Sequence, residues 1–555
     1  MYNGSAAHRH SFHHCPGESA SGGGIMISRN LKRSFSLLVM CVILVMISGT
    51  ASANPNSPQA NDIYVDTTED HYEVVPDGDC SLREAITTIN YGSAFGGCPE
   101  PAGATKISLA EGATYILSIN GADEGYNATG DLDILADMTI RGNNSTVTAW
   151  YLTDRVLNIF TGATVVINDL TIKDGSSVLG GGGILNWGNL TLEDSAVMEN
   201  AVTPGGTGGG IDSWTLGGYE SASLTLHRST IHSNSGYNGA GISIGGGDFS
   251  CDESDIYSNN ASHVGGGLFL LTDVGDYHAR ITRCAIYGNT AEVGGGLYNT
   301  GQTLIEDSYI GENSATNSGG NISNGEYTPS TPAGVLFIIR SVIMNGSAVN
   351  FGGGGVSNSS PAHVSIWFST ITGNISFNTG GGVINFGEVG SGSFTINHTT
   401  LADNLSLAPG SAIAMTSGGV NPLLRIYISN SIISGTSSAL CNTWVDTASY
   451  GNLETTNSCN LNPSLGNFVD TPANFASTLQ FNGSKYLIGV TQFPTYTYAL
   501  LPTSMAVDHA DCELYTEDQR GYPLDVDGDG DGNPQCDMGS YELQRFSFIP
   551  FIKIE

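Results

Sequence analysis

The chain has 555 residues, with 18 basic and 52 acidic side chains, a formal net charge of −34 and 75 glycines. Nucleic acid and anionic membranes repel so acidic a surface, which excludes both as partners. Glycine at roughly twice its average usage, among many Asn, Ser and Thr residues, argues against a helical protein.

The N-terminal residues are predicted to target the protein rather than to fold with it. Residues 1–25 are expected to be a non-native or disordered leader before a start at Met26. Residues 26–53 resemble a secretory signal peptide, with basic residues, an apolar run at 37–47 and a cleavage site at 51–53. Since the apolar run is too short for a membrane span, we expect an exported extracellular or cell-surface protein. No integral membrane span is expected after cleavage.

Residues 54–106 are predicted to form an N-terminal cap. The segment 62–66 has the composition of a strand, and Ser81 can cap a short helix that presents Ala85 and Ile86 on one face. Such a helix would cover the open end of a solenoid, where unpaired strand edges promote aggregation.

Residues 107–436 repeat one pattern in eleven rows. Each row is centred on an aliphatic residue: Ile140, Ile172, Val197, Ile231, Ile256, Ile286, Ile310, Ile343, Ile371, Leu401 and Ile433. In most rows another apolar residue lies five positions earlier, a small or hydroxyl residue two positions earlier, and Asn three positions later, before a glycine cluster. The row spacing varies between 24 and 34 residues, and apolar residues alternate as in strands. The pattern predicts an all-β fold, a right-handed parallel β-helix of about eleven or more coils with disulfide-stapled caps.

Two columns of the repeat are assigned structural roles. The Asn column is expected to adopt the left-handed conformation at a tight corner and to bond the Asn of the next coil. Gly346 replaces Asn in one row and is expected to omit that bond. The column three residues before each aliphatic alternates in charge, with Asp194, Arg228, Glu253, Arg283, Asp307 and Arg340. We predict that these side chains pair between coils.

Other residues leave alternatives open. Asp131 and Asp133 alternate along a strand and could serve acid–base chemistry or bind a cation, but hydrogen bonding within the cap is the favoured interpretation. Tyr257 and Tyr287 occupy equivalent positions in adjacent rows and could form a sugar-stacking stripe. No arrangement of Ser, His and Asp or of Cys and His suggests a nucleophile, so no catalytic residue is assigned.

Residues 437–545 are predicted to form a C-terminal cap, and 546–555 an apolar tail that covers the last edge or serves attachment. The mature chain keeps eight cysteines, an even number as expected after export. The expected disulfides are the sequence-local pairs Cys80–Cys98, Cys441–Cys459 and Cys512–Cys536. Cys251 and Cys284 are expected to be buried thiols rather than a bridge.

An acidic, glycine-rich segment near the C-terminus is a candidate for a structural Ca²⁺ site. Its oxygen ligands would come from Asp525, Asp527, Asp529, Asp531 and Asn533. The segment does not complete an EF-hand, because Cys536 or Met538 stands where the final Glu belongs. The alternative is a solvated acidic turn held by the neighbouring disulfide.

Three segments resemble known families. Residues 79–86, Asp-Cys-Ser-Leu-Arg-Glu-Ala-Ile, resemble the CSLREA domain of exported bacterial proteins, and 130–134, Gly-Asp-Leu-Asp-Ile, is similar to its first coil. Residues 497–508, 518–521 and 536–542 resemble the choice-of-anchor Q domain. The repeat is similar to those of polymorphic outer-membrane proteins, with Ile or Leu in place of Phe. These resemblances imply export and a β-helix, but no agreed activity.

The leading functional prediction is a secreted or cell-surface scaffold, adhesin-like, monomeric and without catalytic activity. Its long loops, at 214–222, 271–279, 324–334 and 386–393, would contact surface glycans or components of host or neighbouring cells. The alternative is a polysaccharide-active β-helix enzyme, a pectin lyase-like lyase or a glycosidase. That enzyme would need unmatched carboxylates and basic residues in one cleft.

Overall fold

The computed structural model describes residues 62–544, which fall in one unit of the chain, 60–555. Within this range the description leaves out residues 76–77, 104, 123, 218–220, 272–277, 326–332, 360, 388–391, 418–424, 443–444, 477, 486 and 513–514. The predicted leader, signal peptide and apolar tail lie outside the described residues.

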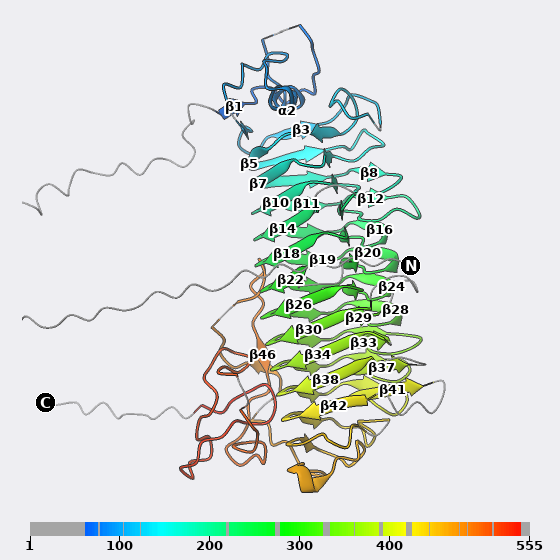
Figure 1. Ribbon diagram of the computed structural model, residues 1–555, viewed down its shortest axis with the longest axis vertical. Coiled ribbons are helices and arrows are strands. Elements are labelled where there is room, and N and C mark those ends of the chain that lie inside the picture. Colours follow the sequence, from blue (N-terminus) through cyan, green and yellow to red (C-terminus); the bar gives the residue numbers. More distant parts are fainter. Residues whose placement is uncertain are drawn as a thin grey trace, which may run out of the picture. The chain divides into compact units, whose positions relative to one another are not determined.

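The described residues form a parallel β-solenoid of about ten turns with almost no helix (Figure 1). This confirms the predicted all-β, parallel β-helix fold class. Three parallel sheets, here named A, B and C, contain 24, 11 and 9 strands. Among the described helices, none has both the length and the hydropathy of a membrane span.

The strands belong to the sheets as follows. Sheet A comprises β1 (Asp62–Tyr64), β2 (Lys106–Ser108), β3 (Thr114–Ile116), β5 (Met138–Thr148), β7 (Thr164–Lys173), β10 (Asn189–Glu193), β11 (Ala196–Met198), β14 (Ser223–His227), β15 (Thr230–His232), β18 (Asp248–Asp252), β19 (Asp255–Tyr257), β22 (Ala279–Thr282), β23 (Ala285–Tyr287), β26 (Gln302–Glu306), β27 (Tyr309–Gly311), β30 (Val335–Ile339), β31 (Val342–Met344), β34 (His363–Trp367), β35 (Thr370–Thr372), β38 (Ser393–Asn397), β39 (Thr400–Ala402), β42 (Arg425–Ser429), β43 (Ile432–Ser434) and β44 (Leu453–Glu454). Sheet B comprises β4 (Leu132–Ile134), β6 (Leu157–Ile159), β9 (Ile184–Asn186), β13 (Ile211–Trp214), β17 (Ile242–Gly245), β21 (Leu268–Leu271), β25 (Leu297–Asn299), β29 (Ile322–Asn324), β33 (Val356–Ser359), β37 (Val383–Gly387) and β41 (Ile413–Ser417). Sheet C comprises β8 (Ser176–Ser177), β12 (Ala201–Val202), β16 (Ser235–Asn238), β20 (Asn260–Val264), β24 (Thr290–Val293), β28 (Ser314–Ser318), β32 (Ser347–Ala348), β36 (Ile375–Ser376) and β40 (Leu405–Ser406).

One coil, β10 to β13, shows the construction. The chain bends at Asp194, with φ 48°, between β10 and β11, and again at Glu199, with φ 57°, before β12. The first bend divides sheet A into a first arm (β10, β14, β18 and their successors) and a second arm (β11, β15, β19 and their successors). Val197 stacks on Ile231 of the next coil, and both side chains are fully buried. Repeating this contact in every coil builds one continuous apolar core.

The predicted Asn ladder forms, but its backbone conformation differs from the prediction. The side-chain amide of Asn200 donates to Oδ1 of Asn234, and that of Asn234 donates to Oδ1 of Asn259, each at 3.0 Å. In these rows the left-handed residue is the one before the Asn, such as Glu199 or Ser233, whereas Asn143 of the first row is itself left-handed. Placing the left-handed conformation on Asn itself was therefore wrong for these rows, because the amide must point into the core to reach its neighbour.

Gly346 supplies no side-chain bond to the ladder, as predicted, but the ladder continues past it through another residue. Asn321, from a glycine cluster in the preceding coil, accepts from Asn313 Nδ2 at 2.9 Å and donates to Asn374 Oδ1 at 3.0 Å. A Cβ on Gly346 would lie 2.5 Å from Asn321 Nδ2 and 2.1 Å from the carbonyl oxygen of Gly354. Gly346 therefore leaves space for an amide that arrives from another position.

A second ladder runs through the hydroxyl column and explains the central cysteines. The backbone N–H of Ser229 donates to the hydroxyl of Ser254, as Ser308 does to Ser341. Cys284 interrupts this column and forms a disulfide with Cys251 of the previous coil. The expectation of two buried thiols was wrong. Both residues are nearly fully buried, and their Cα atoms lie 6.4 Å apart, within disulfide range.

The N-terminal end is covered by helix α2 (Leu82–Tyr91). Ser81 and Glu84 form a reciprocal capping box at its first turn, and the Cys80–Cys98 disulfide closes the adjoining loop. The buried guanidinium of Arg83 pairs with Asp70 and donates to the carbonyl oxygens of Gly130 and Asp131. These contacts anchor the helix to the first coil.

The C-terminal region does more than cap the far end. Residues 437–470, with β44, the short 3₁₀ helix η1 (Pro463–Leu465) and the Cys441–Cys459 disulfide, continue the last turns. The following residues, 474–544, turn back and pack along the outside of sheet A (Figure 1). This returning part, here called the C-terminal strap, includes the hairpin of β45 (Gln480–Phe481) and β46 (Tyr496–Thr497) and the Cys512–Cys536 disulfide. All three sequence-local disulfides are thus present.

Candidate functional site

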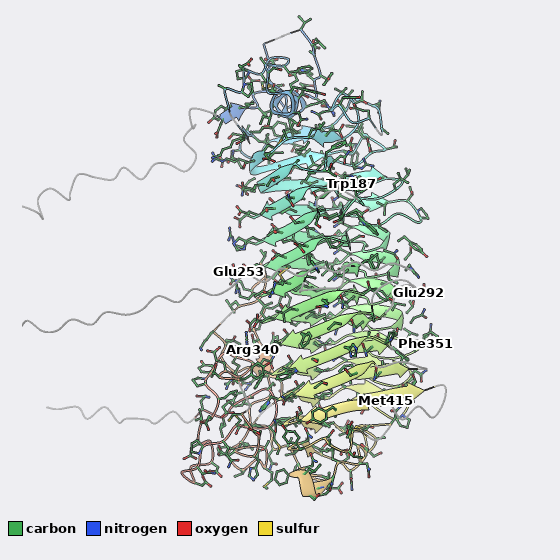
Figure 2. The ribbon with its side chains drawn as sticks, in the orientation of Figure 1. Trp187, Glu253, Glu292, Arg340, Phe351 and Met415 are labelled. Carbon is green, nitrogen blue, oxygen red and sulfur yellow. A yellow bond between two sulfur atoms is a disulfide. The ribbon has the colours of Figure 1, made fainter. Side chains whose placement is uncertain are left out.

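The alternating charges lie at the first bend of each coil, and the predicted ion pairs form. All six residues have positive φ, which directs them away from the core. Each arginine pairs with an acid of the preceding coil: Arg228 with Asp194 at 2.7 Å, Arg283 with Glu253 at 3.2 Å, and Arg340 with Asp307 at 2.8 Å. The hydrogen bonds from Arg228 lower the pKa of Asp194. Figure 2 shows Glu253 and Arg340 on the side of the C-terminal strap, and Glu292, Phe351 and Met415 on the opposite side.

A cavity of about 610 Å³ lies between this charged column and the strap. Asp194, Arg228, Glu253 and Arg283 line one wall, and strap residues from 485 to 492 line the other. Carboxylates and basic residues do converge here from neighbouring coils, as an enzyme would require. Both carboxylates of the wall, however, are held by arginines, so the arrangement stabilises the register of the coils rather than presenting a general base.

The strap is fixed above the second arm of sheet A. The carboxylate of Asp255 accepts the backbone N–H groups of Val490 and Thr491 at 3.0 and 2.9 Å. Burial raises the pKa of this carboxyl, which the two N–H groups partly offset. Beside it, Ile488 packs into an apolar cluster with Ala285.

The tyrosine stripe exists, but its ring faces are already occupied. His232 stacks on Tyr257 at 4.6 Å, and Tyr257 stacks on Tyr287 at 5.0 Å between ring centroids. Phe493 of the strap then contacts Tyr287 edge-on and stacks on Tyr309 at 4.4 Å. Because each tyrosine face meets another ring, this stripe serves packing and offers little surface to a sugar.

Asp131 and Asp133 are buried in the N-terminal end of sheet B. Asp133 accepts the backbone N–H of Asn127 and the side-chain amide of Asn158, each at 3.0 Å. Asp131 pairs with Arg155 at 3.1 Å. Burial raises the pKa of Asp131 to about 8, and the charges of Asp133 and a neighbouring acid add to the shift. Both carboxyls are almost inaccessible, which supports a role in the cap.

The C-terminal motif residues meet in a buried polar network. Arg520 donates to Asp518 at 2.6 Å and to the carbonyl oxygen of Glu542, and it lies 3.7 Å from the ring centre of Tyr541. The Glu542 carboxylate accepts the backbone N–H of Asp537 at 2.9 Å. Burial raises the pKa of Glu542, and the charge of Asp537 raises it further.

The same motif attaches the strap to the solenoid. Gln519 accepts the hydroxyl of Thr370 at 2.6 Å and donates to the carbonyl oxygen of Ser341. Ser540 contacts the hydroxyls of Thr370 and Thr400 at 2.9 and 3.2 Å. Asp518 and Arg520 thus stabilise the strap internally, whereas Gln519 and Ser540 dock it on the second arm.

The acidic segment brings together only part of the predicted calcium site. Oxygen atoms of Asp527 and Asp529 lie within 4.8 Å of each other and of Asp508, which is not among the predicted ligands. Asp525 lines a different cavity, beside His509. Asp508 is buried and belongs to residues 497–508, which resemble the choice-of-anchor Q domain. That resemblance is the signal that could have identified it.

The remaining predicted ligands do not join this group. The Asp531 carboxylate accepts the backbone N–H of Asn533 at 2.8 Å, and neither residue belongs to the group of three carboxylates. Three carboxylate oxygens of this spacing suit a hard cation such as Ca²⁺, so the group fits the predicted metal in part.

Part of each long predicted loop lies outside the described residues. Their flanking strands show that each follows a strand of sheet B, namely β13, β21, β29 and β37. Between β9 and β30, the connections from sheet B to sheet A alternate between short segments, such as 246–247 and 300–301, and long ones. The long loops therefore leave the solenoid along one corner, between sheets B and A.

Comparison with known proteins finds only distant similarity to solved structures. No protein-family model matches the chain, and no curated protein does. Among solved structures, the pectate lyase Pel9A shares 13% identity over 79% of this chain and 88% of its own, with a TM-score of 0.35. Tailspike protein 3 of bacteriophage CBA120 shares 13% identity over 82% of this chain and 73% of its own, with a TM-score of 0.33. At these values the similarity supports no inference about activity.

Proposed function

We propose that this protein is an exported β-helix scaffold, adhesin-like and non-catalytic, that presents binding loops along one corner. The supporting observation is that the coils and the long loops have different roles. The side chains of the charged column pair with one another, whereas the four long predicted loops all follow strands of sheet B at the same corner. Loops on a rigid scaffold are common sites of partner contact.

The test replaces the loops 272–278 and 325–334 with two-residue turns like the one at 246–247. Binding of the purified protein to a glycan array and to whole cells is then measured. Loss of binding supports the proposal. The control is Phe351→Ala, which changes an exposed side chain outside these loops, on the side opposite the C-terminal strap. Unchanged binding after loop shortening would refute the role of the loops.

Export follows from the signal-like segment and from the resemblance to the CSLREA and choice-of-anchor Q families. The placement of both motifs at structural junctions is compatible with it: one builds the N-terminal helix cap and the other docks the strap. Cell fractionation of a tagged full-length chain tests it. Recovery only from the cytoplasm would contradict this proposal.

We also propose that Asp508, Asp527 and Asp529 hold a structural Ca²⁺ ion. Calcium would offset crowded like charges where Asp508 already accepts the backbone N–H of Asp529 at 2.8 Å. The melting temperature should therefore fall when a chelator replaces calcium, and the Asp527→Asn variant should lose most of this difference. An unchanged melting temperature after chelation would rule the ion out.

The competing function is a polysaccharide lyase or glycosidase. The paired carboxylates of the 610 Å³ cavity count against it. Cleavage of a uronate polysaccharide by the purified protein, lost in Glu253→Gln, would reverse this conclusion.

A further inference from the structure

The outer face of the second arm is only partly covered by the strap. From β19 onwards, strap residues contact Asp255, Tyr309, Thr370 and Thr400 in turn. In the coils before β19, half of the equivalent positions are threonines, and two, Ile116 and Met198, are apolar. The full set is Thr114, Ile116, Thr146, Thr148, Thr171, Lys173, Ala196, Met198, Thr230 and His232. Strands β3, β5, β7, β11 and β15 thus form a strip roughly 20 Å long that the described part of the strap leaves open.

Two aromatic side chains stand at the N-terminal end of this strip. Trp150 and Tyr151 form a turn directly after β5 and are 68% and 67% exposed. Their rings meet edge to face, with centroids 6.1 Å apart. Large apolar rings so exposed to water have no packing role in the solenoid, and exposed apolar surface of this kind is typical of binding sites.

The rings border a shallow cavity of about 440 Å³ with a polar floor. Thr148 donates its hydroxyl to Asp174 at 2.8 Å and accepts the backbone N–H of Trp150 at 3.3 Å. Lys173 lies 3.3 Å from the Asp174 carboxylate. The floor therefore holds oriented hydroxyl, carboxylate and ammonium groups beside two apolar rings, the combination by which small polar ligands are fixed in place.

We propose that this strip binds a chain of neutral sugars along the axis of the solenoid, with sugar rings stacked on Trp150 and Tyr151. The C–H faces of a pyranose are apolar and match the rings, while its hydroxyls match the threonines and the Lys173–Asp174 pair. A polyuronate would be repelled by a protein of net charge −34. A protein partner would require a larger continuous apolar surface than these hydroxyl-rich columns provide. The inference goes beyond the loop function, because it uses none of the loops.

The experiment titrates cellohexaose, mannohexaose, laminarihexaose and hexagalacturonate into the full chain, followed by calorimetry and by tryptophan fluorescence. At least one neutral hexasaccharide should bind and shift the emission of Trp150. The double variant Trp150→Ala/Tyr151→Ala should lose about tenfold or more in affinity, because two stacking contacts are removed. Trp150→Phe keeps a ring and should stay within a few-fold of the wild type.

The matched control is Tyr126→Ala, which removes an equally exposed tyrosine, 68%, outside the strip. Its affinity should equal that of the wild type. The inference is overturned if no neutral sugar binds, if hexagalacturonate binds best, if a protein or peptide is the ligand instead, or if the double variant binds normally. Loop shortening that leaves hexasaccharide binding intact would separate this site from the loops, so either proposal can fail alone.

Discussion

Truncating Asn321 to alanine should destabilise the solenoid although the residue lies outside the regular Asn column. Its amide is fully buried and makes four hydrogen bonds, to the backbone N–H and Nδ2 of Asn313, the carbonyl oxygen of Met344 and Oδ1 of Asn374. After truncation, Nδ2 of Asn313 still reaches Ile286, and the Met344 carbonyl and Asn374 Oδ1 keep other donors. The backbone N–H of Asn313 alone is left buried with no acceptor among these contacts.

An orphaned buried donor costs about 1–3 kcal/mol, and each lost net hydrogen bond about 1 kcal/mol. Asn321→Ala should therefore lower the free energy of unfolding by roughly 2–4 kcal/mol, as should Asn374→Ala in the regular column. The assay is denaturant unfolding followed by circular dichroism. Asn350→Ala, on an exposed amide, is the control and should change stability by less than about 0.5 kcal/mol. If Asn321→Ala unfolds together with this control, the ladder does not run through residue 321.

Three further changes test other parts of the structure. Burial raises the pKa of Asp131 to about 8, so the native state keeps a proton that the unfolded chain loses near pH 4, and stability should fall as the pH rises between these values. In Asp131→Asn, the urea midpoint should no longer fall between pH 5 and pH 8. An equal fall in the variant and the wild type would contradict this prediction. Burial lowers the pKa of His398 to about 3, so stability should fall as the pH drops below about 6.5. In His398→Phe, the urea midpoint should depend less on pH below about 6.5. Losing the Cys251–Cys284 bridge should cost about 3 kcal/mol, whereas Cys251→Leu/Cys284→Ser restores the column residues and should recover part of it. Because the other three disulfides remain, reductant should lower the melting temperature of this variant less than that of the wild type; an undiminished effect of reductant would contradict this.

The repeat could be predicted because its information is local and recurs in every coil. Val197 and Ile231 occupy the same register position, and each lies on the strand period that the sequence displays. The ion pairs could be predicted for the same reason, since Arg228 stands one coil after Asp194. The position of the left-handed residue could not, because Glu199 and Asn200 compete for the corner and only the buried ladder decides between them.

The contacts that interrupt the repeat join residues with no fixed spacing. Asn321 bonds residues eight positions before and 53 positions after it, and Ser540 meets Thr370 across 170 residues. Nothing in a local pattern encodes such pairs. The predicted set of calcium ligands differs from the observed carboxylate group for this reason: the acidic spacing includes Asp527 and Asp529, but Asp508 approaches them only because the strap folds back on itself.

The strap determines which surface of the solenoid remains free. If the C-terminal region were only an end cap, the outer face of the second arm would be open along its whole length. Instead, Asp255 fixes the strap at β19, and the Gln519 and Ser540 contacts fix it further along. A ligand that binds this face must therefore use the coils before β19, where the exposed rings of Trp150 and Tyr151 lie. The strap thus restricts ligand binding on this face to one end without taking part in it.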